Sequence, residues 1–362
     1  MLKYSLKRLA SSLITLCIII TVVFVLLRQM PIEGYFDNFE KADQATINAK
    51  LEQLGLNDPV HVQLWHFFRD LINIDIEWHP ENWSLLESEL ESYAPRAVSN
   101  IFDRFKVLLT KDLSWPLEID IDVNLGTSSR YSAGASISEI IAKKAPVSIK
   151  LGVMSMALSL LMGIPLGTAM ARSKGKFWDK IGTMYIVFIN AVPAAVYYIF
   201  IQMYGTNALA IPMLFDQENM VTWILPVVSM SLGSTASYAM WLRRYMVDEM
   251  NKDYVRLARA KGVAEKKIMM KHVFRNAFVP MIQYIPTSLL YTISGSIYIE
   301  SLYSIPGMGG LLVDVIGRQD NPMVQAIVMI YSCIGIVGLL LGDLLMGMID
   351  PRISFVKKEG AR

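Results

Sequence analysis

The sequence predicts an all-α integral membrane protein with six transmembrane helices. Hydrophobic residues make up 53% of the chain, and they gather in long blocks instead of the short periodic runs that build a soluble core. Six blocks reach the roughly 20 residues needed to cross a hydrocarbon layer about 30 Å thick. Lys and Arg side chains also collect on alternate connections between these blocks, as the positive-inside rule requires of a multi-pass membrane protein.

The six expected spans are apolar blocks with charged side chains only near their ends. They cover approximately Leu9–Leu27, Val147–Ala171, Ile181–Tyr204, Thr222–Leu242, Met281–Leu302 and Met323–Met348. The first block could also be a signal peptide, because basic residues precede it. No small-x-small cleavage site follows, since the chain continues with Arg-Gln-Met-Pro at 28–31. We therefore expect an uncleaved first helix.

The distribution of positive charge predicts that both termini face the cytoplasm. The connection 243–280 holds ten Lys and Arg residues, the outer connection between spans three and four holds none, and the last outer connection holds only Arg318. The segment 29–146 then lies outside the cytoplasm. Long exported segments follow the charge rule poorly, so this assignment depends on the neighbouring spans.

The expected domain organisation follows from the spans. Its four parts are the N-terminus with the first helix (1–28), an extracytoplasmic segment (29–146), a five-helix core with a cytoplasmic loop at 243–280 (147–350), and a cytoplasmic tail (351–362). Within the second part, residues 75–123 contain three tryptophans, which is too aromatic for a disordered tether. We expect a small, mostly helical inserted domain there.

Several spans carry more small and polar residues than a simple anchor needs. In the second span, small residues recur at every fourth position, which favours close packing against another helix over a direct transport role; they are Ser155, Ser159, Gly163 and Gly167. Hydroxyl groups and helix breakers in the fourth and fifth spans cost free energy unless they face protein or water. We expect a polar translocation path there, with interhelical hydrogen bonding as the alternative. The candidate path residues are Ser234, Thr235, Gln283, Ser294 and Ser296.

Ionised side chains are scarce inside the expected spans. Lys150, Glu300 and Asp343 all lie near span ends. A secondary transporter driven by an ion gradient usually needs a carboxylate or a histidine inside the membrane. This weakens the alternative of a self-sufficient secondary transporter, and the polar spans weaken that of a simple membrane anchor.

No pattern in the sequence indicates an enzyme, a metal centre or a cofactor. The G-x-x-x-x-G-K-[ST] loop that holds nucleotide phosphates does not occur, and neither do His-Glu-x-x-His or Cys-x-x-Cys. His61, His66 and His79 favour a polar helix surface over a metal site. We therefore expect no catalytic residue, no metal, no cofactor and no nucleic-acid partner for this chain.

The connection between the fourth and fifth spans predicts two short helices joined at a glycine. Asp253 is placed to cap the first helix, and Gly262 lies where a helix ends in a left-handed turn. The second helix should run from about Ala264 until Pro280 interrupts it. Such an elbow offers a knob for a partner's groove, although a solvated basic loop is the alternative. Apolar side chains that could enter the groove are Val255, Leu257 and Ala258, and basic ones for its rim are Arg256, Arg259 and Lys261.

Motifs of a known family follow one another along the chain. They are A-x-A-K-G at 258–262, K-H-V-x-R-N-A-x-x-P at 271–280, L-G-L-N-D-P-V at 54–60, N-L-G-T-S at 124–128, E-S-L-Y-S-I-P-G-M-G at 300–309 and D-P-R at 350–352. The first two resemble the EAA loop of ABC-transporter permeases in the oligopeptide, dipeptide and nickel import branch. The others resemble that branch's outer segments, the stretch after its fifth span and its C-terminal signature. The resemblance covers about 1–74 and 124–355.

The resemblance implies a type I ABC importer permease with an extracytoplasmic domain inserted after the first helix, in the cell membrane and in contact with its lipid. The loop would dock on a nucleotide-binding ATPase subunit through Arg256, Leu257, Ala258, Arg259, Ala260, Lys261 and Gly262. The implied partners are two such ATPase subunits, a second homologous permease subunit, an extracytoplasmic substrate-binding protein and a peptide substrate. Import of nickel or a metal chelate is the alternative within the family.

Two departures from the family pattern limit what the resemblance implies. The general EAA pattern has glutamate six residues before the glycine, whereas this chain has Arg256. An acidic contact with the ATPase is therefore not carried over, although the loop can still dock. Residues 75–123 look like an insertion relative to typical members, and the resemblance gives them no role.

Overall fold

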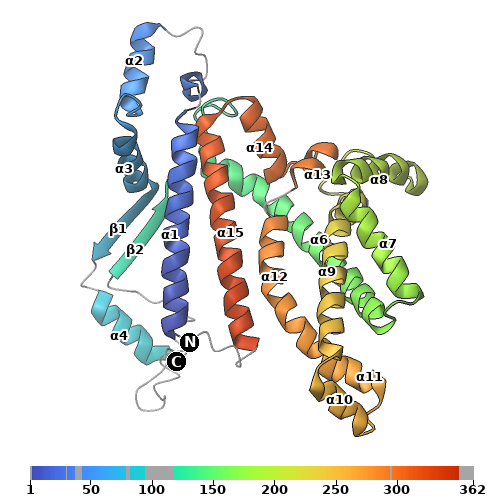
Figure 1. The fold of residues 1–362 in the computed structure, drawn as a ribbon. Helices are drawn as coiled ribbons and strands as arrows, with labels where there is room; N and C mark the ends of the chain where they lie inside the picture. Colours follow the sequence, from blue (N-terminus) through green and yellow to red (C-terminus); the bar gives the residue numbers. More distant parts are fainter. Residues whose placement is uncertain are drawn as a thin grey trace. The chain divides into compact units, whose positions relative to one another are not determined.

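The computed structural model describes residues 2–29, 31–36, 43–78, 82–93, 117–293 and 296–349, which are mostly helical (Figure 1). The chain forms two compact units. The larger unit combines residues 1–41 with 127–362, and the smaller unit is 42–126.

The smaller unit combines helices with a pair of strands. Its described elements are α2 (Gln44–Gln53), α3 (Val60–Leu71), β1 (Ile72–Trp78), α4 (Asn82–Tyr93) and β2 (Leu117–Val123). The two strands are antiparallel, with Ile72 opposite Val123 and Trp78 opposite Leu117. They depart from the all-α expectation because both alternate apolar with polar residues, the period of a strand, and their isoleucines favour extended backbone. The inserted domain expected at 75–123 falls partly outside the described residues, at 79–81 and 94–116.

The larger unit is built from helices. They are α1 (Leu2–Leu27), η1 (Ile32–Tyr35), α6 (Ile137–Arg172), α7 (Phe177–Ala191), α8 (Ala194–Leu209), η3 (Met220–Trp223), α9 (Ile224–Met250), α10 (Asp253–Ala260), α11 (Glu265–Lys267), η4 (Ile268–Phe274), α12 (Arg275–Ile293), α13 (Ile297–Leu302), α14 (Met308–Gly317) and α15 (Asn321–Ile349). Among the described residues, four helical stretches are long and apolar enough to cross a membrane: they lie in α1, in α6, in α9 with η3, and in α15. The pair α7 and α8 makes a fifth if it is counted as one span.

The third expected span is broken, not straight. α7 ends at Ala191 and α8 begins at Ala194, with a bend of 105° between them. Pro193 lacks an N–H group, and its ring disfavours helical backbone in the preceding residue. Val192 is accordingly extended, with φ −88° and ψ 129°. The proline inside the apolar block therefore corrects the expectation of one continuous helix over Ile181–Tyr204.

The fifth expected span falls on α12 and α13, and residues 294–295 between them lie outside the described part. α12 continues through Pro280 and Pro286, so the expectation that Pro280 interrupts the helix is wrong. Helices packed among other helices tolerate proline when neighbouring groups satisfy the freed backbone carbonyls. The chain before α12 is π-helical over Ile268–Phe274, which places an irregular turn just upstream of the first proline.

The small residues of α6 pack this helix against α9, which runs beside it (Figure 1). A Cβ atom on Gly167 would lie 2.7 Å from the carbonyl oxygen of Ala239, and one on Gly163 would lie 2.9 Å from the Cβ atom of Tyr238. The Ser159 hydroxyl donates to the carbonyl of Ser231 at 3.1 Å. The packing role that the sequence favours for this stripe is confirmed.

Candidate coupling site

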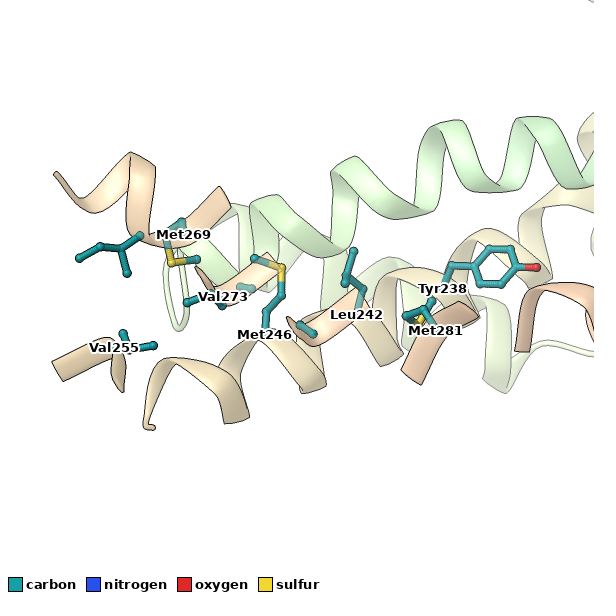
Figure 2. Close-up of a cluster of buried hydrophobic side chains, with 10 residues drawn as sticks. Tyr238, Leu242, Met246, Val255, Met269, Val273 and Met281 are labelled. Atoms are coloured by element: carbon teal, nitrogen blue, oxygen red, sulfur yellow. The ribbon is translucent and has the colours of Figure 1, made fainter. Parts of the chain in front are cut away.

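The connection after α9 folds into a packed module at one end of the larger unit, and we call residues 253–280 the coupling loop (Figures 1 and 2). Helices α10, η4 and the start of α12 pack on the last turns of α9 through one apolar core. The buried residues of this core are Ala171, Tyr238, Leu242, Met246, Val255, Ile268, Met269, Val273, Ala277 and Met281. A solvated basic loop would leave the apolar side chains in water, so that alternative does not describe this segment.

The two sides of α10 face different surroundings. Val255 has 0% exposed surface and points into the apolar core (Figure 2), so the expectation that it enters a partner's groove is wrong. Leu257 lies on another side of the helix and is 55% exposed. Ala258 is half-buried against the core, and Arg256 is exposed. Because neighbouring residues of a helix point in different directions, the core fixes which side chains α10 presents outward.

Gly262 forms the turn of the elbow. Its φ is +71°, and the N–H of Val263 donates to the carbonyl of Ala258 at 3.1 Å, which closes the helix in a left-handed turn. No atom lies within 4 Å of a Cβ built on Gly262. The backbone conformation, not lack of space, therefore favours glycine, and the expected left-handed turn is confirmed. Ala260 and Lys261, just before it, are exposed.

The start of α10 differs from the expectation by one residue. Lys252 holds the N-cap position, and Asp253 is the first helical residue. The Asp253 carboxylate accepts a hydrogen bond from Arg256 at 3.4 Å and does not cap a backbone N–H. An acidic side chain in the first turn still interacts favourably with the helix dipole.

An ion pair spans the elbow. Arg259 Nη2 donates to Glu265 Oε1 at 2.7 Å, and Nε donates to Oε2 at 3.1 Å. The guanidinium holds the pKa of Glu265 below its ordinary value. The side chains are 43% and 57% exposed, so the pair contributes little to stability. It engages Arg259 across the elbow, whereas Arg256 pairs with Asp253 within α10. Lys261, which follows the helix, is exposed.

A polar junction that sequence reasoning missed ties the coupling loop to both adjoining helices. The Tyr254 hydroxyl donates to the carboxylate of Glu249 at the end of α9 and accepts from Asn276 Nδ2, at the start of α12, at 2.9 Å. Burial raises the pKa of Tyr254, and the hydrogen bond to Glu249 adds to this effect. The only sequence signal was that these residues share one loop, because Tyr254 and Asn276 are 22 residues apart.

The candidate path residues of α9 differ in burial. Thr235 is 1% exposed, and its backbone lies against α6, where a Cβ on Gly163 would come within 3.0 Å of its carbonyl oxygen. Ser234 is half-buried. Ser294 lies outside the described residues. Thr235 therefore lies in the contact between α9 and α6, and a path role for Ser234, Thr235 and Ser294 stays a prediction.

The remaining two candidate path residues, Gln283 and Ser296, form hydrogen bonds outside α9. Gln283 Nε2 donates to Asp343 Oδ1 of α15 at 3.0 Å. Ser296 holds the N-cap position of α13, where its hydroxyl accepts from the N–H of Ile299 at 3.4 Å. Gln283 thus lies between α12 and α15, and Ser296 begins α13. A contribution of either residue to a path also stays a prediction.

Glu300, expected near a span end, is a buried junction. It is 1% exposed. Its Oε1 accepts from the Ser148 hydroxyl at 2.8 Å, and its Oε2 accepts from the N–H groups of Gly309 and Gly310 at 2.6 and 2.9 Å. A Cβ on Gly307 would lie 2.5 Å from the same oxygen. The carboxylate therefore joins α6 and α13 to the first turn of α14, where helix N–H groups favour negative charge.

A second buried carboxylate belongs to Asp320, which is 0% exposed. Its Oδ2 accepts from the Ser128 hydroxyl at 2.6 Å and from the backbone N–H groups of residues 129–131 at 3.1, 2.9 and 2.9 Å. Its Oδ1 accepts from the N–H of Met323 at 3.2 Å, in the first turn of α15. Burial raises the pKa of Asp320, but these donors outweigh burial and hold the pKa below its ordinary value.

Arg130 completes this junction, which we call the Asp320–Arg130 clasp. Its Nε donates to the carbonyl of Phe36 at 2.8 Å, and its Nη2 donates to the carbonyl of Glu33 at 2.6 Å. Its Nη1 donates to the carbonyl of Arg318 at 3.3 Å. The clasp thus ties the segment after α1 to those before α6 and α15. Sequence analysis missed it because its members are about 95 to 190 residues apart.

The described residues contain no group of three His, Cys, Asp or Glu side chains placed to hold a metal ion. His61 and His66 are exposed on α3, and His79 lies outside the described part. Cys17 and Cys333 are free thiols.

Residues 163–355 match the family described as binding-protein-dependent transport system inner membrane component, and 1–82 match the N-terminal part of such membrane components. The chain is 38% identical over 212 residues to the oligopeptide transport system permease protein AmiC of Streptococcus pneumoniae, covering 58% of this chain and 42% of AmiC. The chain therefore matches less than half the length of that relative.

Two further relatives match over almost their whole length. The dipeptide transport system permease protein DppB of Lactococcus lactis is 29% identical, with 98% of this chain and 99% of DppB covered. The protein of the same name in Bacillus subtilis is 26% identical, with 99% and 100% covered. The similarity to these two proteins therefore includes both units of the chain.

Proposed function

Because the chain belongs to the family of binding-protein-dependent transport system inner membrane components, we propose that it is one permease subunit of an ATP-driven importer of oligopeptides or dipeptides. The membership confirms the resemblance drawn from the loop motifs. The chain forms half of a translocation path across the cell membrane. It hydrolyses no ATP itself and couples to a separate ATPase through the coupling loop.

The packing of α10 is the observation that carries this proposal. Val255 fixes the helix to a core that α9 and α12 share, while Leu257 and the basic rim remain exposed. Buried side chains interlock closely, so a packed core transmits displacement. An ATPase bound to the exposed side would therefore move the ends of two membrane helices together with the loop.

The relatives support a peptide as the cargo. Both DppB proteins, named for dipeptide transport, match this chain from end to end, and AmiC is named for oligopeptide transport. None of these three names favours nickel or a metal chelate. Peptide is therefore the cargo class we propose.

The proposed assembly holds two ATPase subunits, a second homologous permease subunit and an extracytoplasmic substrate-binding protein. The chain crosses the membrane six times with both termini in the cytoplasm, so the coupling loop faces the ATPase and residues 29–146 face the binding protein. The bent pair α7 and α8 supplies the third crossing, and α12 with α13 supplies the fifth. The charge distribution of the sequence supports this orientation.

Docking is tested by placing a bulky side chain at the elbow. Gly262→Trp forces a side chain into left-handed backbone, which costs about 1–2 kcal/mol, and adds bulk where the ATPase would bind. We expect the purified permease to lose its ATPase. The matched control is Gly134→Trp, because Gly134 also has a positive φ, +80°, and open space around it, but lies far from the coupling loop in the sequence. Loss of the ATPase from both variants, or from neither, contradicts the docking role.

Cargo is tested with the reconstituted complex in lipid vesicles. We expect uptake of a labelled dipeptide or oligopeptide to require ATP, the ATPase and the binding protein. Uptake by the isolated chain under an ion gradient would contradict the proposal and favour a secondary transporter. For the path, Ser234→Leu and Ser294→Leu should slow uptake without releasing the ATPase; unchanged uptake would remove both residues from the path.

A further inference from the structure

A charged contact joins α7 to α9 near the coupling loop. Arg243 Nε donates to Asp179 Oδ1 at 2.5 Å, and Nη2 donates to Oδ2 at 2.8 Å. Oδ2 also accepts from the N–H of Gly175, in the turn between α6 and α7, at 2.7 Å. Asp179 is 5% exposed, and the Arg243 side chain is 31% exposed. Arg243 of α9 therefore binds both oxygens of the carboxylate, and the turn between α6 and α7 binds one of them.

The end of α9 is held on two sides. Leu242 and Met246 are both 0% exposed in the coupling-loop core (Figure 2). Arg243 follows Leu242 directly, which turns its side chain by about 100° around the helix, and it reaches α7 beside α9 (Figure 1). Apolar packing thus fastens the coupling loop to one side of this helix end, and a bidentate ion pair fastens α7 to another.

The ion pair adds a constraint that apolar contact does not supply. A bidentate guanidinium–carboxylate contact fixes orientation as well as distance, whereas apolar attraction has no direction. We propose that Asp179 and Arg243 are positioning residues that make α7 and the coupling loop move as one body, so that ATPase movement reaches the third crossing as well as α9 and α12. This rests on the function proposed above.

The break at Val192–Pro193 sets the far limit of this body. The 105° bend interrupts the helix between α7 and α8, and the proline removes the backbone hydrogen bond that would continue it. The pair therefore carries α7 as far as the break. The ion pair does not reach α8, whose Tyr197 packs on α7 and α9 through apolar contacts. Because apolar attraction has no direction, we expect α8 to shift relative to the coupling loop during the ATP cycle.

Distances within the full complex test this directly. Cys17 and Cys333 are replaced by alanine, and spin labels are placed at the exposed Lys180 of α7 and Lys266 of α11. We expect a narrow distance distribution that ATP leaves unchanged. With one label at Lys266 and the other at Asn207 of α8, ATP should change the distance. A change of equal size in both label pairs would overturn the proposal.

Substitutions of Asp179 and Arg243 test what the ion pair itself contributes. Asp179→Asn and Arg243→Gln should each broaden the Lys180–Lys266 distribution and lower transport per ATP by about tenfold, since each leaves its partner uncompensated. The double variant should be no worse than the worse single one, because both remove the same contact. The double variant leaves no unpaired charge, so it still tests the contact if a single variant fails to fold.

The neighbouring arginine provides the matched control. Arg244 is exposed, and its guanidinium lies over the Trp241 ring, so Arg244→Gln makes the same change of charge one residue away. It should behave as the unsubstituted protein does. Equal effects of Arg243→Gln and Arg244→Gln, or additive losses in the Asp179→Asn/Arg243→Gln variant, would overturn the proposal. If the unsubstituted complex fails to import peptide, the proposed cargo is wrong, but the distance measurement still decides whether the pair joins α7 to the loop.

Discussion

The coupling loop and the Asp320–Arg130 clasp both hold distant segments of the larger unit together, but the loop does so largely by apolar packing and the clasp by polar contacts. The coupling loop is fastened by a core of side chains such as Val255 and Met246. The clasp is fastened by hydrogen bonds to a buried carboxylate and a guanidinium. Apolar attraction has no direction and depends on the area buried, whereas an unmade buried hydrogen bond is costly. The core of the coupling loop should therefore respond to side-chain volume, and the clasp to the loss of a hydrogen-bond partner.

Removing the carboxylate of the clasp should have the largest effect on stability. Asp320→Ala leaves the Ser128 hydroxyl and several backbone N–H groups without an acceptor, so the free energy of unfolding should fall by about 4 kcal/mol. Thermal unfolding in detergent measures this. Asp320→Asn keeps one acceptor oxygen and should lose less. Equal stability of Asp320→Ala and the unsubstituted protein would contradict a clasp held by this carboxylate.

The apolar core of the coupling loop should instead respond to volume. Met246→Ala removes a fully buried side chain and should cost about 3 kcal/mol, while Met246→Leu conserves volume and should cost less than about 1.5 kcal/mol. The same unfolding measurement compares the two. If Leu proved as costly as Ala, shape and direction would matter in this core as they do in the clasp, and the contrast between the regions would fail.

The clasp should respond to acid, and the coupling-loop core should not. The donors around Asp320 hold its pKa below the ordinary value of 3.8, so folding favours the ionised carboxylate. Its stabilising contribution is then fully present above the unfolded-state pKa and is lost as pH falls through the lower folded-state pKa. The difference in melting temperature between the unsubstituted protein and Asp320→Asn should stay constant down to about pH 5 and shrink below about pH 4. A constant difference throughout would show that Asp320 does not act through its charge.

The exposed pair across the elbow should have the smallest effect. Arg259→Gln or Glu265→Gln removes a contact that water and salt screen, so the free energy of unfolding should change by at most about 0.5 kcal/mol. This change should disappear at high ionic strength. A loss of several kcal/mol would mean that the coupling loop, like the clasp, depends on polar contacts.

The sequence predicted well those features that are written in local patterns. Apolar blocks located α1, α6, α9 and α15, and the glycine after a short helix located the elbow at Gly262. Two features that differ from the expected fold also have local signals. Pro193 inside an apolar block marks the bend of the third crossing, and alternating isoleucines mark β1 and β2.

Other features could not be predicted because no local pattern encodes them. Asp320 meets Ser128 across 192 residues, and Arg130 meets Glu33 across 97. Which side of α10 faces outward also depends on the core beneath it, which is why Val255 was assigned to the partner's groove and proved to be buried. Distant contacts of this kind follow from the packing of whole helices.

The most direct test of the account is a cross-link from the exposed side of α10. In a chain whose Cys17 and Cys333 are replaced by alanine, Leu257→Cys should cross-link to the ATPase, because residue 257 is 55% exposed. Val255→Cys, two residues away at a position that is 0% exposed, should not cross-link. A cysteine at 257 that reacts with a membrane-impermeant reagent added outside intact cells, or that forms no cross-link to the ATPase in the assembled complex, would contradict the docking role of the coupling loop.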